Sequence, residues 1–290
     1  MEKHKLAGLL AGLGASSIWG GMYVVSKVVL EVIPPFALLT TRLVLGILSL
    51  AVVIALRSKT AMTARQAWSI FGVGFIGYGV SLGFQFVGTK LSTASNGALV
   101  TSATPAFILL FAPLLLGEKT TPRGVIALTI SSLGVLAVID PRNAELSPGL
   151  FWGNLSLLAA AVTWALYSVL VRKTTRAVDV VTATTVMLAG GLPTGIILGV
   201  WEINTQGVGI ITPAIIGGIL FLGIVSTAFA MFLWNYAFAE LPAAAASLTF
   251  FAQPVVGALL GWLLLGEKIT PLFLFGGMLI GIGLVVASRN

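Results

Sequence analysis

The sequence contains no cysteine, and only 9% of its residues are charged, whereas 58% are hydrophobic. The absence of cysteine excludes a disulfide framework and a thiolate metal site. A soluble domain carries about 25% charged residues, so this chain has too few charges to cover a water-exposed surface. We infer that a lipid bilayer is the solvent for most of the chain.

Groups that could act as catalytic acids or bases are also scarce in the apolar stretches. The single histidine is His4, near the start of the chain, and we place no Asp or Glu at membrane depth. An intramembrane enzyme needs an acid, a base or a nucleophile inside its bundle. We therefore expect no enzyme, no catalytic residue, no cofactor and no metal site. The missing carboxylate also predicts transport without proton coupling.

The net charge of +7 is spread over short segments between apolar stretches. No long basic run or soluble domain is present in the sequence, which argues against nucleic acid as a partner. Most lysines and arginines instead fall in the loops on the side of the N-terminus. This asymmetry favours a cytoplasmic location for both chain ends.

One segment occurs twice in the sequence. Residues 114–122 read LLLGEKTTP, and residues 263–271 read LLLGEKITP, with a single difference. An internal repeat in an apolar chain is typical of transporters that are built from two related halves. We therefore predict a first repeat over residues 1–145 and a second over residues 146–290.

Charges and prolines divide the chain into ten apolar stretches, each long enough to cross a bilayer as a helix. The predicted spans are 6–28, 36–56, 67–88, 92–116, 122–139, 149–171, 180–200, 213–237, 242–264 and 270–287. Because five spans per repeat is an odd number, the second repeat enters the membrane from the opposite side. The predicted fold is an all-α polytopic membrane protein, with ten transmembrane helices in two inverted five-helix repeats around a central cavity.

Two prolines, Pro105 and Pro254, occupy matching places near the centres of the fourth and ninth spans. Proline lacks a backbone donor and clashes with the carbonyl four residues earlier, so it interrupts a helix. Interrupted helices at corresponding places of two halves indicate a transport site. A plain kink, satisfied by neighbouring helices, is the alternative. We predict that both prolines mark helix breaks that serve in gating.

Amides and deep aromatic rings supply the candidate binding residues. Amide side chains both donate and accept hydrogen bonds, which suits a zwitterionic ligand. Trp19 and Trp164 fall at equivalent places of the two repeats, where their rings either contact an apolar group or an ammonium or pack helices together. The candidate substrate-binding residues are Trp19, Tyr23, Tyr78, Gln85, Asn96, Thr101, Trp164, Tyr167, Asn235 and Gln253.

Three cations lie within or at the ends of predicted spans. Arg42 lies inside the second span, and we expect its side chain to snorkel toward the outer interface. The alternative is an interior contact that holds this span in place or attracts a carboxylate. Lys27 and Arg172 end the first and sixth spans at matching places, and we expect them to snorkel as well.

Several motifs resemble those of a known family. They are Ile18-Trp-Gly-Gly21, Thr41-Arg-Leu43, and the two proline-containing spans that end in Leu-Leu-Gly-Glu-Lys. In these motifs the chain resembles the EamA family of the drug/metabolite transporter superfamily, and within that family it is most similar to the YddG-type amino-acid exporters. The resemblance implies a ten-helix basket, a central cavity lined by spans 1, 3, 4, 6, 8 and 9, and export by alternating access.

We therefore expect a multi-pass transporter of the bacterial inner membrane. It is expected to export amino acids, with aromatic and other apolar ones favoured, or similar small metabolites. An exporter of drugs or other metabolites, or a lipid flippase, is the alternative. The expected partners are the small-molecule substrate and the lipid bilayer. The oligomeric state is left open, and a monomer is compatible with the sequence.

Overall fold

The computed structural model describes residues 2–56, 62–92, 97, 100–139, 148–175, 178–265 and 271–288. Every described element of secondary structure is a helix. Six helical stretches are long and apolar enough to cross a membrane, and four shorter apolar helices accompany them. The described part of the chain thus has the make-up of an all-helical, multi-pass membrane protein.

The helices of the first half are, in order, α1 (Glu2–Leu30), α2 (Pro35–Ala55), α3 (Ala64–Gly74), η1 (Phe75–Ser81), α4 (Leu82–Leu91), α6 (Thr104–Leu116) and α7 (Pro122–Ile139). Local signals explain several of their ends. The Thr63 side chain accepts a hydrogen bond from the backbone N–H of Gln66 and starts α3 with a capping box. Gly117 has a φ of 68° and ends α6 in the left-handed conformation that glycine tolerates.

The helices of the second half are, in order, η3 (Pro148–Leu150), α8 (Phe151–Thr174), α9 (Val180–Gln206), α10 (Pro213–Leu220), η4 (Phe221–Phe229), α11 (Ala230–Glu240), α12 (Ala243–Leu248), η5 (Thr249–Phe251), α13 (Ala252–Leu265) and α14 (Pro271–Ser288). The Asp179 side chain accepts hydrogen bonds from two backbone N–H groups and starts α9. This helix continues past residue 200, where the sequence predicted its end.

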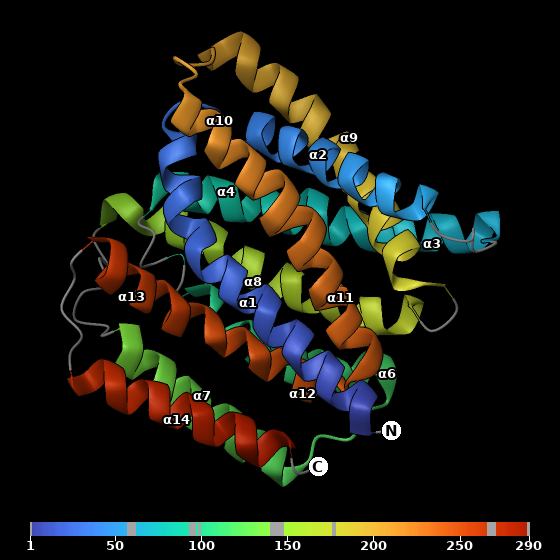
Figure 1. The fold of residues 1–290 in the computed structure, drawn as a ribbon, viewed down its shortest axis with the longest axis vertical. Helices are drawn as coiled ribbons and strands as arrows, with labels where there is room; N and C mark the ends of the chain where they lie inside the picture. The colour runs from blue at the N-terminus through green and yellow to red at the C-terminus, as the bar shows by residue number, and fades with distance from the viewer. Residues whose placement is uncertain are drawn as a thin grey trace.

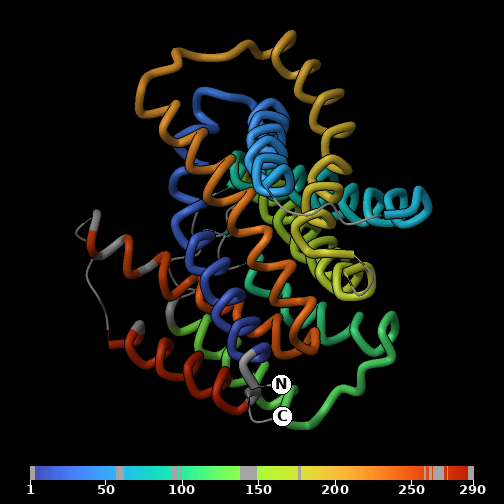
Figure 2. Tube along the Cα trace, turned by 45° about the vertical axis from the view of Figure 1, so that its right-hand side comes forward, coloured from blue at the N-terminus to red at the C-terminus, as the bar shows by residue number. Residues whose placement is uncertain are grey.

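The two halves pack through equivalent pairs of helices. α1 packs against α11 and α13, and α8, which holds the equivalent place in the second half, packs against α4 and α6. α2 packs against α9, and α7 packs against α14, at opposite sides of the bundle (Figures 1 and 2). When each helix is replaced by its equivalent in the other half, every packed pair becomes another pair of the same set.

Both central prolines begin a new helical segment. A turn at residues 102–103 precedes α6, and Pro105 lies in the first turn of that helix. The 3-10 turn η5 precedes α13, and Pro254 lies in the first turn there. Proline is tolerated in a first turn because the missing N–H would have no intrahelical partner. The helix geometry therefore changes just before each proline.

Two π-helical stretches, η1 and η4, interrupt the long helices that run from α3 to α4 and from α10 to α11. A π-helix closes hydrogen bonds from residue i to residue i+5 and occurs frequently at functional sites. In η4, the Thr227 hydroxyl donates to the carbonyl of Leu222 at 2.6 Å. In η1, the Ser81 hydroxyl donates to the carbonyl of Ala160 in α8 at 2.9 Å. The faces of the two π-helical stretches that carry Ser81 and Thr227 thus lie in the interior of the bundle.

Candidate functional site

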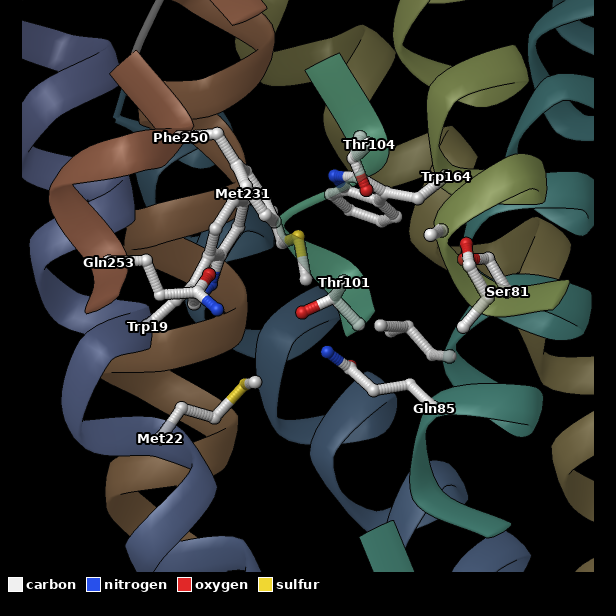
Figure 3. Close-up of a pocket in the computed structure, with 13 residues that line it drawn as sticks. Trp19, Met22, Ser81, Gln85, Thr101, Thr104, Trp164, Met231, Phe250 and Gln253 are labelled. Atoms are coloured by element: carbon white, nitrogen blue, oxygen red, sulfur yellow. The ribbon is translucent and has the colours of Figure 1, made fainter. Parts of the chain in front are cut away.

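A pocket lies inside the bundle, where residues of α1, η1, α4, the turn before α6, α6, α8, α11, η5 and α13 meet (Figure 3). These elements fall in spans 1, 3, 4, 6, 8 and 9, the set that the family resemblance implies. The lining residues are Trp19, Met22, Ser81, Leu82, Gln85, Thr101, Thr104, Ala160, Ala161, Trp164, Met231, Phe250 and Gln253. The space open to the centre of a water molecule is about 30 Å³. The pocket therefore admits water and is narrow in this conformation.

Three aromatic rings, those of Trp19, Trp164 and Phe250, line one wall of the pocket, and the ring of Trp234 packs against all three. The ring of Trp19 meets that of Trp164 edge to face, with centroids 5.6 Å apart, and lies 5.3 Å from that of Trp234. Phe250 contacts the same cluster, 6.2 Å from Trp19. The indole N–H of Trp19 donates to the carbonyl of Ser226 in η4 at 3.0 Å. This bond and the tilted ring contacts fix the wall in one orientation.

Four buried polar atoms on the pocket have no hydrogen-bond partner in the described part of the chain. They are Gln85 Oε1, Thr104 Oγ1, Trp164 Nε1 and Gln253 Nε2. A buried polar group without a partner costs about 1–3 kcal/mol. Four such atoms around a single pocket therefore indicate that a polar ligand or water completes them. Thr104 and Gln253 directly precede Pro105 and Pro254, so the two helix breaks present equivalent polar side chains to the pocket.

A chain of hydrogen bonds connects spans 1, 3 and 4 beside the pocket. The amide of Gln85 donates to the hydroxyl of Tyr23 at 2.8 Å. The Tyr23 hydroxyl lies 2.9 Å from that of Thr101, which donates to the carbonyl of Gly97 at 2.6 Å. Tyr23 does not line the pocket itself. It holds Gln85 and leaves the carbonyl of that amide free.

Tyr78, Tyr167 and Asn235 form a closed network behind the pocket wall. The Tyr167 hydroxyl donates to Asn235 Oδ1 at 2.6 Å and also contacts the Tyr78 hydroxyl. Asn235 Nδ2 donates to Thr184 Oγ1 at 2.9 Å and to the Tyr78 hydroxyl at 3.2 Å. The three residues are fully buried, bond to one another and are not among the residues that line the pocket. The ring of Trp164 lies 4.8 Å from that of Tyr167, so the network supports the wall.

Half of the candidate binding residues line the pocket: Trp19, Gln85, Thr101, Trp164 and Gln253. Asn96 lies outside the described residues. The sequence argument did not single out the small and flexible apolar residues of the lining, which are Met22, Leu82, Ala160, Ala161, Met231 and Phe250. An apolar residue that faces a pocket and one that faces lipid look alike in a sequence, so no local signal could have identified them.

Arg42 does not snorkel, and that expectation is wrong. Its side chain is fully buried, and its Nε donates to the hydroxyl of Thr227 in η4 at 2.7 Å. The two terminal nitrogens lie 3.9 and 4.0 Å from the sulfur of Met22, which lines the pocket. The guanidinium thus turns toward the interior of the bundle, where hydroxyl groups accept its hydrogen bonds.

Glu202 is a buried acid that the sequence argument missed. It belongs to α9, near the C-terminal end of that helix and past the predicted end of the seventh span at residue 200. Its Oε2 accepts the backbone N–H groups of Phe36 at 2.7 Å and Ala37 at 3.3 Å. These donors lie in the first turn of α2, where they lack intrahelical partners and favour a negative charge. The Pro34-Pro35 start of α2 is the signal that such donors needed an acceptor.

Lys27 also binds inside the protein instead of snorkelling. Its Nζ donates to three carbonyl oxygens at the end of α4, those of Thr89 at 3.1 Å, Lys90 at 3.3 Å and Ser92 at 2.7 Å. The last carbonyls of a helix have no intrahelical donor, and a cation is favourable there. Lys27 therefore joins the end of α1 to the end of α4.

Arg172 joins the end of α8 to the end of α11, which are the equivalent helices of the second half. Its Nη1 donates to the carbonyls of Phe238, at 3.1 Å, and Leu241 near the end of α11, and its Nε forms an ion pair with Glu118. The other oxygen of Glu118 accepts the backbone N–H of Ala243 at 2.9 Å. The expectation that Arg172 snorkels is corrected for the same reason as for Lys27.

Comparison with known proteins identifies the family. The sequence pattern of the EamA-like transporter family matches residues 6–139 and again residues 151–289. The chain belongs to the EamA-like transporter family. An uncharacterized transporter of Archaeoglobus fulgidus is 26% identical to this EamA protein over 94% of this chain and 96% of its own length. The uncharacterized transporter YoaV of Bacillus subtilis is 24% identical over 95% and 94% of the two chains.

A solved crystal structure has the same fold as this EamA protein. It superposes with a TM-score of 0.80 at 22% identity and covers 97% of this chain and 96% of its own. The family and its relatives are transporters, not enzymes. This EamA protein is accordingly a multi-pass membrane transporter.

Proposed function

We propose that this transporter exports amino acids, with aromatic and other apolar ones favoured, or similar small metabolites across the bacterial inner membrane. The carrying observation is the central pocket, which combines an aromatic wall with four buried polar atoms that lack partners. The proposal places the protein with the YddG-type exporters that its sequence resembles. It invokes no cofactor, metal ion or nucleic acid, and it needs only the substrate and the lipid bilayer.

The chemistry of the pocket suits a small zwitterion with an apolar side chain. The N–H groups of Trp164 and Gln253 can donate to a substrate, the Thr104 hydroxyl can donate or accept, and the carbonyl of Gln85 can accept from an ammonium. The rings of Trp19 and Trp164 offer an apolar surface and a cation–π contact to the same ammonium. A substrate of this kind would satisfy atoms that the protein leaves unpaired.

A wider cavity lies nearer the N-terminus of α1 and supports alternating access. This vestibule offers about 720 Å³ to water-sized molecules and is lined by Leu9, Ala112, Arg172 and residues around them. Leu248 lines the vestibule and Phe250 lines the pocket, so the two spaces approach each other at η5. We propose that helices part here to let a substrate pass. The breaks at Pro105 and Pro254 are the hinges that we propose for this motion.

Ten spans in two inverted five-helix repeats form the scaffold of the proposal. Three observations support it. The family pattern matches the chain twice, the packed helix pairs are exchanged between the halves, and Lys27 and Arg172 cap equivalent helices. Arg172 lines the vestibule together with Lys5 at the start of α1, whereas Lys27 lies at the other end of α1. Equivalent contacts thus occupy opposite ends of the bundle, as inversion requires.

A lipid flippase is the second candidate function. Apolar side chains and the cations Lys5 and Lys119 line the vestibule together, a combination that suits an amphiphile with an anionic headgroup. The central pocket, with its aromatic lining and four buried polar atoms, suits a small polar cargo better than a phospholipid. Scrambling of a labelled phospholipid in proteoliposomes, without amino-acid exchange, would favour this candidate.

The transport proposal predicts exchange of apolar amino acids in proteoliposomes that contain the purified protein. Radiolabelled aromatic amino acids should enter faster than in protein-free liposomes, and a pH gradient alone should not drive them uphill. Failure of every amino acid to exchange would exclude the proposed substrate class. Uphill accumulation driven by the pH gradient would contradict uncoupled transport, and Glu202→Gln would then be the first variant to test.

The proposed topology predicts opposite labelling of two introduced cysteines. The natural sequence has no cysteine, so each variant reports a single place. Lys5→Cys should react only with reagents that reach the cytoplasm, because both termini are placed there. Lys90→Cys, at the other end of the bundle, should react from outside intact cells. Labelling of the two positions from the same side would contradict the odd-numbered inverted repeats.

A further inference from the structure

Arg42 is a buried cation for which the described residues supply no counter-charge. Its side chain has 0% exposure, in the middle of α2. The ion pairs in the described part of the chain are His4 with Glu240 and Arg172 with Glu118, and neither involves Arg42. An uncompensated buried charge is strongly destabilising. Its presence therefore calls for a function.

The contacts of the Arg42 guanidinium satisfy only part of it. A guanidinium has five N–H donors. The Nε donates to Thr227 Oγ1 at 2.7 Å, and Nη2 lies 3.5 Å from Ser226 Oγ. The remaining contacts are the sulfur of Met22, a weak acceptor, and the ring of Phe86, with its centroid 5.0 Å from the guanidinium carbon. The two terminal nitrogens, which form the fork that binds carboxylates, thus have one long hydrogen bond, to the Ser226 hydroxyl, and otherwise only weak contacts among the described residues.

Met22 connects this fork with the central pocket. It contacts both terminal nitrogens of Arg42, and it lines the pocket beside Trp19 on α1 (Figure 3). Ser226 connects the same two groups, because its carbonyl accepts from Trp19 and its hydroxyl lies beside Arg42. A methionine side chain has three rotatable bonds and adapts readily to a new space. A change of its rotamer would expose the guanidinium to the pocket.

We propose that Arg42 binds the carboxylate of the substrate after Met22 moves aside. A guanidinium and a carboxylate form two parallel charge-assisted hydrogen bonds, which are stronger and more selective than neutral ones. The substrate would then supply the counter-charge that the described residues lack. This inference rests on the proposed transport function and narrows its substrate class to compounds that carry a carboxylate. Amines and amides of the same shape would bind poorly.

Matched acids and amides test this inference. Phenylalanine and phenylalaninamide differ only at the carboxylate, and so do 3-phenylpropionate and its amide. Binding to the purified full-length protein is measured from the ligand-concentration dependence of its melting temperature, because a ligand stabilises the state it binds. The wild-type protein should prefer an acid to its amide by about 10- to 100-fold, the range of a charge-assisted hydrogen bond.

Substitution of Arg42 should remove this preference. In Arg42→Gln the ratio of acid to amide affinity should fall to within about threefold, since the charge is gone. Arg42→Lys keeps the charge but not the planar fork, so it should retain an intermediate preference and tests the inference even if the glutamine variant does not fold. Thr41→Ala is the matched control, because the Thr41 hydroxyl donates only within its own helix, to Ala37.

The outcomes separate the inference from the proposed function. If both Arg42 variants lost the same factor of binding affinity for an acid and for its amide, the role of Arg42 would be purely structural and the inference would be overturned. A wild-type protein that prefers no acid to its amide would overturn it too. Preference for 3-phenylpropionate but not for phenylalanine, lost in the Arg42 variants, would support the inference and refute amino acids as the cargo.

Discussion

Replacement of Trp164 by alanine is expected to weaken substrate binding by about 2- to 30-fold and to leave the protein folded in the membrane. A lost cation–π contact costs roughly 0.5–2 kcal/mol, which corresponds to this range. Trp164 lines the pocket, and its indole N–H has no partner among the described residues. The apparent affinity is measured from the concentration dependence of amino-acid exchange in proteoliposomes. Trp164→Phe, which keeps a ring but not the N–H, should fall between the wild type and the alanine variant.

Trp68 is the matched control for this prediction. Its side chain is 72% exposed on the surface of α3, where an interfacial belt explains a tryptophan. Trp68→Ala should therefore change transport little. Trp19→Ala should resemble Trp164→Ala, since Trp19 occupies the equivalent place in the first repeat. If Trp68→Ala weakens affinity as much as either, the assignment of the pocket is wrong. The side chain of Trp262, which the sequence also assigns to a membrane-interface belt, lies outside the described side chains.

Replacement of Asn235 by alanine is expected to lower the free energy of unfolding by about 2–5 kcal/mol. Side-chain hydrogen bonds between membrane helices contribute roughly 0.6–1.7 kcal/mol each, and Asn235 bonds to Tyr167, Thr184 and Tyr78. Its removal leaves their hydroxyl groups without a shared partner in a fully buried place. The change is measured by reversible unfolding in mixed detergent micelles.

Tyr236→Phe provides the control on the same helix. Tyr236 is only half-buried and stacks on Phe232, so the loss of its hydroxyl should change stability little. Equal stability of the two variants would show that the network behind the pocket contributes nothing. A stable Asn235→Ala protein with weakened binding would instead assign Asn235 a direct role at the substrate.

The sequence predicted an all-helical, multi-pass membrane protein because hydropathy and proline breaks are local signals, and the family resemblance implied which elements surround the pocket. Pro105 and Pro254 pointed to the places where Thr104 and Gln253 meet the pocket. The sequence did not predict which polar residues face the pocket. Tyr78 and Gln85 lie on the same long helix, yet one is enclosed in a closed network and the other lines the space. That difference depends on which side chains of other helices surround each residue.

The predictions for the charged residues differed from the structure for a related reason. Arg42, Lys27 and Arg172 were expected to reach toward the interface, as isolated cations in a lipid-exposed helix do. In the folded bundle each instead finds oxygen atoms from another span, such as Thr227 for Arg42. The sequence did not single out Glu202 because α9 continues beyond its most apolar stretch, and Glu202 lies in that continuation. Partners that are distant in sequence, up to 185 positions for Arg42 and Thr227, leave no local pattern.

The π-helical stretches η1 and η4 each accommodate an extra residue in one of the two long helices. If such a wide turn moved along its helix by exchange of neighbouring hydrogen bonds, part of that helix would rotate without unfolding. The residues that a wide turn passes rotate by about 100° and advance by about 1.5 Å, one residue step of an α-helix. Ser81 lies in η1, and Leu82 and Gln85 follow it directly. A one-residue migration of the wide turn would therefore swing pocket-lining side chains from one face of the helix to another, and the carrier could reshape its interior while its ends stay anchored.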